Sequence, residues 1–205
     1  MRAGGEMSMN HVWNHFYTIT KHKCLVMEGC FRLGLYRQGL LHDLSKYGPT
    51  EFLVGCKYYK GYMSPNNAER EHKGYSSAWL HHKGRNKHHL EYWVDYAARE
   101  DEKEHGGMVG MKMPIEYVVE MFVDRVSASK NYQKKAYTDA SALIYYQNSL
   151  PHYLIHEDTA ALLDYLLTML AKRGEKETFH YIKTRVLQGK VPYDANILKR
   201  RKQKL

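Results

Sequence analysis

The feature that most constrains this chain is the spacing of its apolar residues, which recur at helical intervals along almost the whole length. The stripe of the predicted first helix consists of Val12, Phe16, Ile19, Lys23 and Val26. A later apolar face consists of Leu162, Leu163, Leu166, Leu167 and Leu170. No segment shows the strict alternation that is typical of a half-buried strand. We therefore predict an all-α fold.

Glycine and proline divide this pattern into elements. The second predicted helix begins near Tyr36 and carries His42 and Asp43 toward its end. Further helices are predicted at 50–59, 76–82, 88–104 and 115–132, followed by the leucine-rich helix, which Gly174 ends. Residues 60–74, rich in Gly, Ser, Pro and Asn, are predicted to form a long loop. We expect one compact domain over residues 1–205, with a metal-binding helical core at about 10–135, packing helices at 136–198 and a basic tail at 199–205.

The net charge of +9 is concentrated at the C-terminus, where five basic residues fall in the last seven positions: Lys199, Arg200, Arg201, Lys202 and Lys204. A solvated tail of this kind attracts nucleic acid only nonspecifically. No apolar run approaches a membrane span, and the polar start has no signal-peptide core, so we expect a cytoplasmic protein without membrane contact. Three cysteines without a paired motif argue against a zinc ribbon.

The unusual feature of the composition is its 13 histidines. Candidate metal ligands fall in four places: His11, His15 and His22; His42 and Asp43; His81, His82, His88 and His89; and Glu116, Glu120 and Asp124. Asp124 lies between apolar neighbours, where a carboxylate is costly to bury without a cation or several donors. For Glu116 and Glu120, a solvated role and a role in the site are equally open.

The doubled histidines are difficult to explain as packing, because neighbours on a helix point about 100° apart. One member of each pair is therefore expected to be a ligand, and the other to contact that ligand or a substrate. His82 and His89 are preferred, since a spacing of seven residues would place both on one helical face. Which member of each pair is the ligand stays open.

The order and spacing of several of these residues resemble the pattern of the HD superfamily of metal-dependent phosphohydrolases. The resemblance covers roughly residues 20–130 and rests on His22, on His42-Asp43 followed by Ser45-Lys46, and on Asp124. Within that superfamily the chain is similar to a bacterial group of HD-like proteins of unknown function. The resemblance implies that His22, His42, Asp43 and Asp124 are the primary metal ligands and that Lys46 faces a phosphate. It also implies that histidines between 81 and 89 hold a second ion.

We accordingly predict a metal-dependent hydrolase that acts on a phosphate ester or nucleotide through a metal-activated water. Its cofactor would be one or two divalent ions of Mn, Fe, Zn, Co or Ni, with Asp43 between them. Asp43 would assist proton transfer, while Lys46 and Arg85 would hold the phosphate of a small phosphorylated substrate. Two alternatives stay open: a di-iron oxygenase of the HD type, and a non-catalytic metal-stabilised helical module that binds an anionic partner through its basic end.

Overall fold

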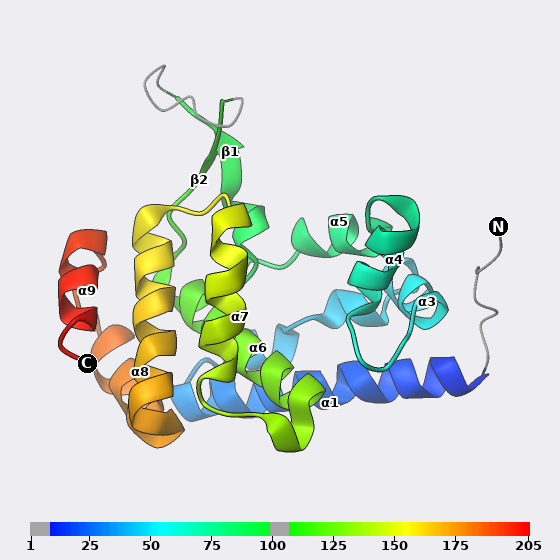
Figure 1. Ribbon diagram of the computed structural model, residues 1–205, viewed down its shortest axis with the longest axis horizontal. Helices are drawn as coiled ribbons and strands as arrows, with labels where there is room; N and C mark the ends of the chain where they lie inside the picture. The colour runs from blue at the N-terminus through cyan, green and yellow to red at the C-terminus, as the bar shows by residue number, and fades with distance from the viewer. Residues whose placement is uncertain (1–8, 99–106) are drawn as a thin grey trace.

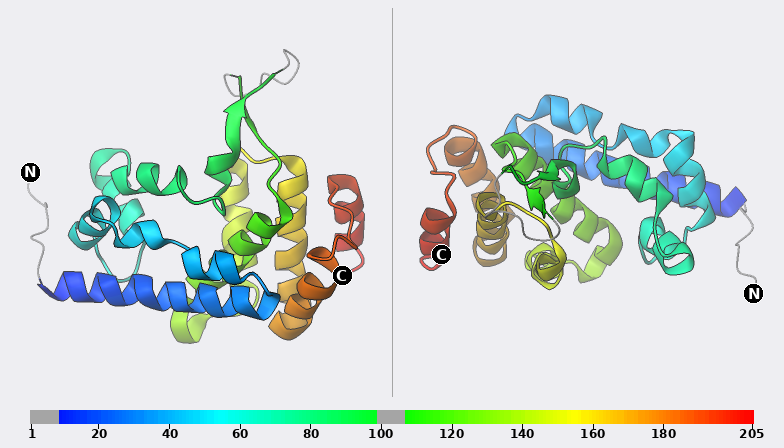
Figure 2. Two further views of the ribbon diagram at one scale, coloured as in Figure 1. Left: turned by 180° about the vertical axis from the view of Figure 1, so that it is seen from behind. Right: turned by 90° about the horizontal axis from the view of Figure 1, so that it is seen from above.

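Helix α1 (Met9–Leu33) runs along the base of the molecule and passes beneath two groups of helices (Figure 1). The structure is a computed structural model that describes residues 9–98 and 107–205. The first group contains α2 (Tyr36–Leu41), a 3-10 turn at Leu44–Tyr47, α3 (Pro49–Lys57), α4 (Pro65–Lys73) and α5 (Ser77–Lys83). The second contains α6 (Ile115–Gln133), α7 (Ser141–Ser149), α8 (Glu157–Tyr181) and α9 (Ala195–Lys202). Figure 2 shows the same arrangement from behind and from above.

The prediction of an all-α fold is confirmed, with one small exception. After a 3-10 turn at Leu90–Trp93, strands β1 (Val94–Tyr96) and β2 (Met108–Gly110) form a two-stranded antiparallel sheet that projects from the helices (Figure 1). The helix predicted at 88–104 is wrong over the described residues 88–98, where the chain forms this 3-10 turn and β1. Residues 99–104 of the prediction lie outside the described part. Gly110 allows the ribbon to approach the chain, because a Cβ there would lie 2.7 Å from the backbone of Ile155 and His156.

The loop predicted at 60–74 is wrong, because α4 occupies most of it. Pro65 opens this helix, where a missing N–H costs nothing, and Gly74 closes it in a left-handed conformation with φ of 82°. The proline and glycine that suggested a loop are therefore helix boundary signals. Glu69 anchors the helix: it is buried and accepts hydrogen bonds from Ser76 Oγ (2.8 Å) and Ser77 Oγ (2.7 Å) at the start of α5.

The buried face of α1 also differs from the predicted stripe. Phe16 is 40% exposed, and the buried positions are His15, Ile19, His22, Val26, Gly29, Cys30 and Leu33. The true stripe contains two histidines, which a search for apolar residues alone does not include. It turns His22 toward α6, and it packs His15 against Gly55, where a Cβ would lie 2.1 Å from His15 Nε2.

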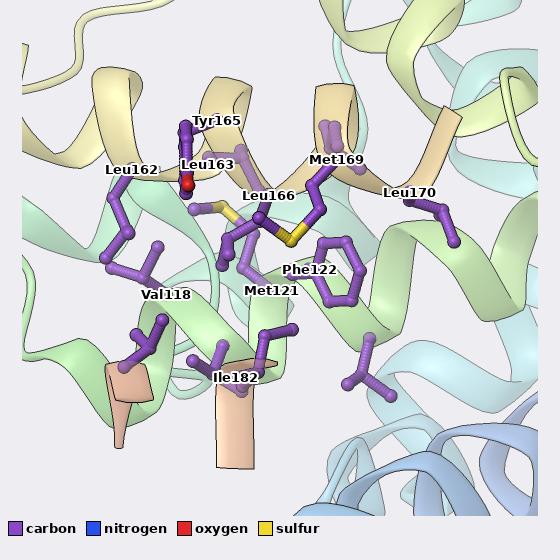
Figure 3. Close-up of a cluster of buried hydrophobic side chains, with 14 of the residues drawn as sticks. Val118, Met121, Phe122, Leu162, Leu163, Tyr165, Leu166, Met169, Leu170 and Ile182 are labelled. Carbon is purple, nitrogen blue, oxygen red and sulfur yellow. The ribbon is translucent and has the colours of Figure 1, made fainter. Parts of the chain in front are cut away.

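The main apolar core lies between α6 and α8, with the π-helical turn Ile182–Val186 closing one end (Figure 3). The leucines predicted to form one face of α8 are all buried: Leu162, Leu163, Leu166, Leu167 and Leu170. Gly174 was predicted to end that helix. Instead the chain kinks there, with φ of 78°, and the helix continues to Tyr181.

The basic end is not a solvated tail throughout, because α9 continues to Lys202. Asp194 caps this helix by accepting a hydrogen bond from Ile197 N at 3.0 Å, and Leu198 is fully buried. Lys202 forms an ion pair with Asp164 of α8. Within the described ranges, no helix has the length and apolarity needed to cross a membrane.

Candidate metal centre

The centre begins with an unusual turn at His42 and Asp43. Helix α2 ends at Leu41, His42 takes φ of −51° and ψ of 125°, and Asp43 takes the left-handed conformation with φ of 54°. Aspartate is among the few non-glycine residues that adopt this conformation readily. The turn brings two consecutive side chains together, with His42 Nε2 3.3 Å from Asp43 Oδ2. A continuous helix would have pointed them about 100° apart.

A first group of ligand atoms joins this turn to α1 and α6. His22 Nε2 lies 2.9 Å from Asp124 Oδ1 and 3.8 Å from Asp43 Oδ2. His42 Nε2 lies 3.5 Å from Asp124 Oδ1. Atoms that each lie about 2 Å from one ion are separated by distances of this order. His22, His42, Asp43 and Asp124 could therefore hold a metal ion, and they are the four residues that the resemblance implied.

A second group lies on the other side of Asp43. Asp43 Oδ1 is 3.2 Å from His82 Nε2 and 3.3 Å from His88 Nε2, and His82 Nε2 is 2.9 Å from His89 Nε2. Asp43, His82, His88 and His89 could likewise hold a metal ion. Both histidines of the pair at 88–89 reach this group, whereas the sequence led us to expect one of them.

His82 and His89 do come together, but not on one helical face. Helix α5 ends at Lys83, and the following turn folds back so that the two rings meet. Asn86 holds this turn, because its Nδ2 donates to the His82 carbonyl at 2.8 Å and to Ser45 Oγ at 3.0 Å. His82 and His89 are therefore close together as expected, but a turn and not a continuous helix brings them together.

Asp43 belongs to both groups through different oxygens. Its Oδ2 faces His22 and His42, and its Oδ1 faces His82 and His88. Lys46 Nζ also lies 2.5 Å from Oδ2. A carboxylate placed in this way can bridge two ions, which is the arrangement expected for Asp43 from the sequence.

Two further carboxylates hold the opposite nitrogens of the imidazoles. Glu120 Oε1 lies 2.9 Å from His42 Nδ1 and 3.1 Å from His88 Nδ1, and Glu51 Oε2 lies 2.8 Å from His82 Nδ1. A carboxylate at Nδ1 keeps the ring proton on that nitrogen and leaves the lone pair of Nε2 free to bind a metal ion. All three Nε2 atoms are then directed at Asp43. Glu120, left open by the sequence, thus lies in the site, and Glu51 of α3 was missed.

The inner atoms lack partners in the described part of the chain. Nε2 of His22, His42 and His88 and Oδ1 of Asp43 are buried and accept or donate no hydrogen bond there. Buried polar groups are normally satisfied, and leaving them unpaired costs free energy. Unsatisfied atoms in both groups, gathered around Asp43, fit the binding of a divalent cation.

The electrostatics are those of tightly packed opposite charges. Burial disfavours the charged forms of both His42 and Asp43, but their mutual attraction, with Lys46 nearby, holds the pKa of Asp43 well below its usual range. Asp43 and the neighbouring carboxylates raise the pKa of His42 well above its usual range. His89 differs, because burial and the adjacent imidazoles lower its pKa well below the usual range.

A cleft of about 700 Å³ opens onto the centre. Its lining includes His22, Lys46, His89 and Asp124, so both groups are accessible from it. Arg85, predicted to hold a phosphate, does not line it. The residue is exposed in the turn after α5, and its guanidinium donates to the His81 carbonyl at 3.1 Å.

The cleft has other basic residues that the sequence did not single out. Arg70 of α4 and Arg125 of α6 both line it. Arg125 follows Asp124 directly, which was the one available signal for it.

Comparison with known proteins gives a family without an assigned activity. The model of a family of unknown function (DUF5662) matches residues 11–169, a span that includes both ligand groups. No curated protein matches the chain, and no solved structure matches it.

Proposed function

We propose that this chain, which belongs to the DUF5662 family, is a metal-dependent hydrolase of phosphate esters. The observation that carries the proposal is the convergence of two ligand groups on Asp43, beside a cleft that His22, His89 and Asp124 line. The Nε2 atoms of His22, His42 and His88 and the Asp43 Oδ1 atom lack partners in the described residues, and a cation would satisfy them. The resemblance to HD phosphohydrolases, which rests on His22, His42, Asp43 and Asp124, also supports this proposal.

The donor set suits divalent transition ions. Imidazole nitrogen and carboxylate oxygen together accept Mn, Fe, Co, Ni or Zn. We propose two ions, one in each group, with Asp43 shared between them. Bound there, such ions would lower the pKa of a coordinated water and polarise a phosphoryl oxygen.

The side chains of the protein supply the remaining functions. Lys46 Nζ is the cation nearest Asp43 Oδ2 and also lines the cleft, so it can hold a phosphoryl oxygen as a point charge. Asp124 is the carboxylate of the first group that reaches the cleft, and it can accept a proton from an attacking water. Glu51 and Glu120 keep the imidazoles oriented through Nδ1.

The test combines elemental analysis with a screen of phosphate esters and nucleotides for phosphate release. We expect the wild type loaded with one of the candidate ions to release phosphate, and Lys46→Met to keep its metal while losing most turnover. Arg85→Gln is the matched control, because it removes an exposed basic residue outside the cleft. Turnover of Lys46→Met at the wild-type rate would remove Lys46 from the site. A metal-loaded wild type that releases phosphate from no ester would contradict the proposal.

A second candidate function has one observation in its favour, the surplus of imidazoles. Five of them, His22, His42, His82, His88 and His89, belong to the two groups, and nitrogen-rich sets also suit iron. The alternative is a di-iron oxygenase, and iron-dependent O2 consumption without phosphate release would favour it. Tight metal binding with neither activity would favour the non-catalytic helical module.

A further inference from the structure

The cleft is far larger than a single phosphate group requires. Its volume of about 700 Å³ lies within the range of pockets that enclose whole small molecules. Beyond the centre, its lining includes Tyr145, Ser149 and Tyr153, from α7 and the turn after it. A substrate that fills this space extends from the metal centre along α6 to the α7 wall.

Arg125 lines the cleft beside Tyr153, and its charge has no matching partner there. Its Nη1 and Nη2 both contact one neutral atom, Tyr153 Oη, at 3.3 and 3.4 Å. Its Nε is buried and has no hydrogen-bond partner among the described residues. A guanidinium carries five N–H donors, so a single phenol oxygen leaves most of them unmatched.

No carboxylate in residues 9–98 or 107–205 forms an ion pair with Arg125. Instead its guanidinium lies near the faces of two tyrosine rings, 5.5 Å from the Tyr146 centroid and 5.3 Å from the Tyr153 centroid. Two arginines outside the cleft are paired with carboxylates: Arg173 with Glu177 at 2.7 Å, and Arg32 with Glu175. Arg125 is therefore held in place by aromatic rings while its hydrogen-bonding capacity stays available at the cleft.

This guanidinium is directed away from the metal centre. Asp124 and Arg125 are consecutive on α6, so their side chains leave the helix about 100° apart. Asp124 is directed at His22 and His42, whereas Arg125 is directed at the tyrosines of the α7 side. Both residues nevertheless line the same cleft. One substrate can therefore reach the centre and Arg125 at different ends.

We propose that Arg125 and Tyr153 bind a second anionic group of the substrate, a phosphate or a carboxylate at a distance from the phosphate held at the metal centre. The planar fork of Arg125 can bind two oxygens of such a group, and the Tyr153 hydroxyl can donate to one of them. The substrate is then a phosphate ester with two anionic groups. The inference rests on the proposed function, because it assumes that the other group lies at the metal centre.

The experiment compares ligands with one and two anionic groups on the metal-loaded full-length chain. The probes are alkyl phosphonates, α,ω-alkane bisphosphonates of increasing length, and phosphonocarboxylates of the same lengths, with affinities measured by calorimetry. For at least one length, we expect the probe with two anionic groups to bind the wild type about tenfold or more tightly than its alkyl phosphonate. Whichever of the bisphosphonates and phosphonocarboxylates binds more tightly shows whether the second group is a phosphate or a carboxylate.

The variants are Arg125→Gln and Arg125→Lys, with Arg85→Gln as the charge-matched control outside the cleft. We expect both Arg125 variants to lose most of the extra affinity for probes with two anionic groups. Their affinity for alkyl phosphonates and their metal content should stay unchanged. Arg85→Gln should keep the advantage. Lysine retains a cation beside the tyrosine rings but lacks the planar fork, so this variant carries the test if Arg125→Gln does not fold.

Three outcomes would overturn the inference. The first is a wild type that shows no advantage at any length, and the second is an equal advantage in wild type and Arg125→Lys. Either would leave the proposed function in place. The third is a metal-loaded wild type that binds no alkyl phosphonate, which would contradict the proposed function together with the inference.

Discussion

The two sides of α6 are buried in opposite ways. One side packs Val118 and Phe122 into the apolar core against α8 (Figure 3). The other places Glu120 and Asp124 among histidines from α1 and from the turns after α2 and α5. The apolar core is stabilised by surface removed from water and by close packing. The polar centre has unsatisfied atoms that a ligand can complete. Stability should therefore depend mainly on the first side, and metal binding on the second.

The largest effect is expected at Asp43, which belongs to both ligand groups. Asp43→Asn keeps the size of the side chain and tolerates the left-handed backbone, but it removes the shared charge. We expect metal affinity to fall by about a thousandfold or more, beyond the 10–100-fold typical of outer residues, at nearly unchanged helical content. Elemental analysis and circular dichroism check this. Wild-type metal content in the variant would contradict the assignment of Asp43.

The next effect concerns the apolar side and should leave the metal unaffected. Phe122 is fully buried beside Phe179, with ring centroids 6.1 Å apart. Phe122→Ala should lower the free energy of unfolding by about 3–5 kcal/mol through the cavity it creates. Urea denaturation measures the loss, and metal content per folded chain should match the wild type. Loss of metal without loss of stability would break the proposed division between the two sides.

A smaller effect is expected from the carboxylate that orients two imidazoles. Glu120→Gln removes the charge that holds Nδ1 of His42 and His88 but keeps the size of the side chain. We expect metal affinity to fall about 10–100-fold. Glu116→Gln, one turn earlier on the same helix, is the matched control. Equal affinities in the two variants would show that Glu120 does not position the ligands.

The smallest effect is a pH dependence away from the centre. Hydrogen bonds from Lys73, Ser77 and Ser76 hold the pKa of the buried Glu69 at about 2, although burial opposes this, whereas its ordinary value is 4.5. A lowered pKa stabilises the fold above pH 4.5, and this stabilisation is lost as the pH falls toward 2.

Glu69→Gln should therefore flatten the acid dependence of the free energy of unfolding, by about 1–3 kcal/mol in that interval. Urea denaturation of the metal-free protein at a series of pH values measures it. The control is Glu71→Gln, which removes the carboxylate of an exposed pair with Lys60. Parallel curves for wild type and Glu69→Gln would show that Glu69 does not contribute in this way.

The same contrast explains what the sequence could predict. Apolar spacing is a local property, so the buried leucines of α8 and the all-α fold followed from it. Prediction from local pattern failed on α1, where polar residues occupy the buried face. It also failed for α4, where proline and glycine form the two ends of a helix. The meeting of His42, Asp43 and Asp124 is not a local property, and only the resemblance to a family anticipated it.

The outer parts of the site could not be predicted for a related reason. Glu51 lies in α3, and nothing in its local sequence distinguishes it from a surface glutamate. His82 and His89 were expected together from helical spacing, yet the chain leaves the helix before His89 and returns through a turn held by Asn86. Arg85 lies among these histidines in the sequence, but that turn exposes it.

The central claim is that Asp43 joins two separate metal sites, and metal stoichiometry tests it most directly. His82→Gln and His89→Gln together remove two imidazoles from the second group and none from the first. We predict about two ions per chain in the wild type and about one in the double variant, following the two-metal arrangement. The same stoichiometry in both proteins would contradict the account.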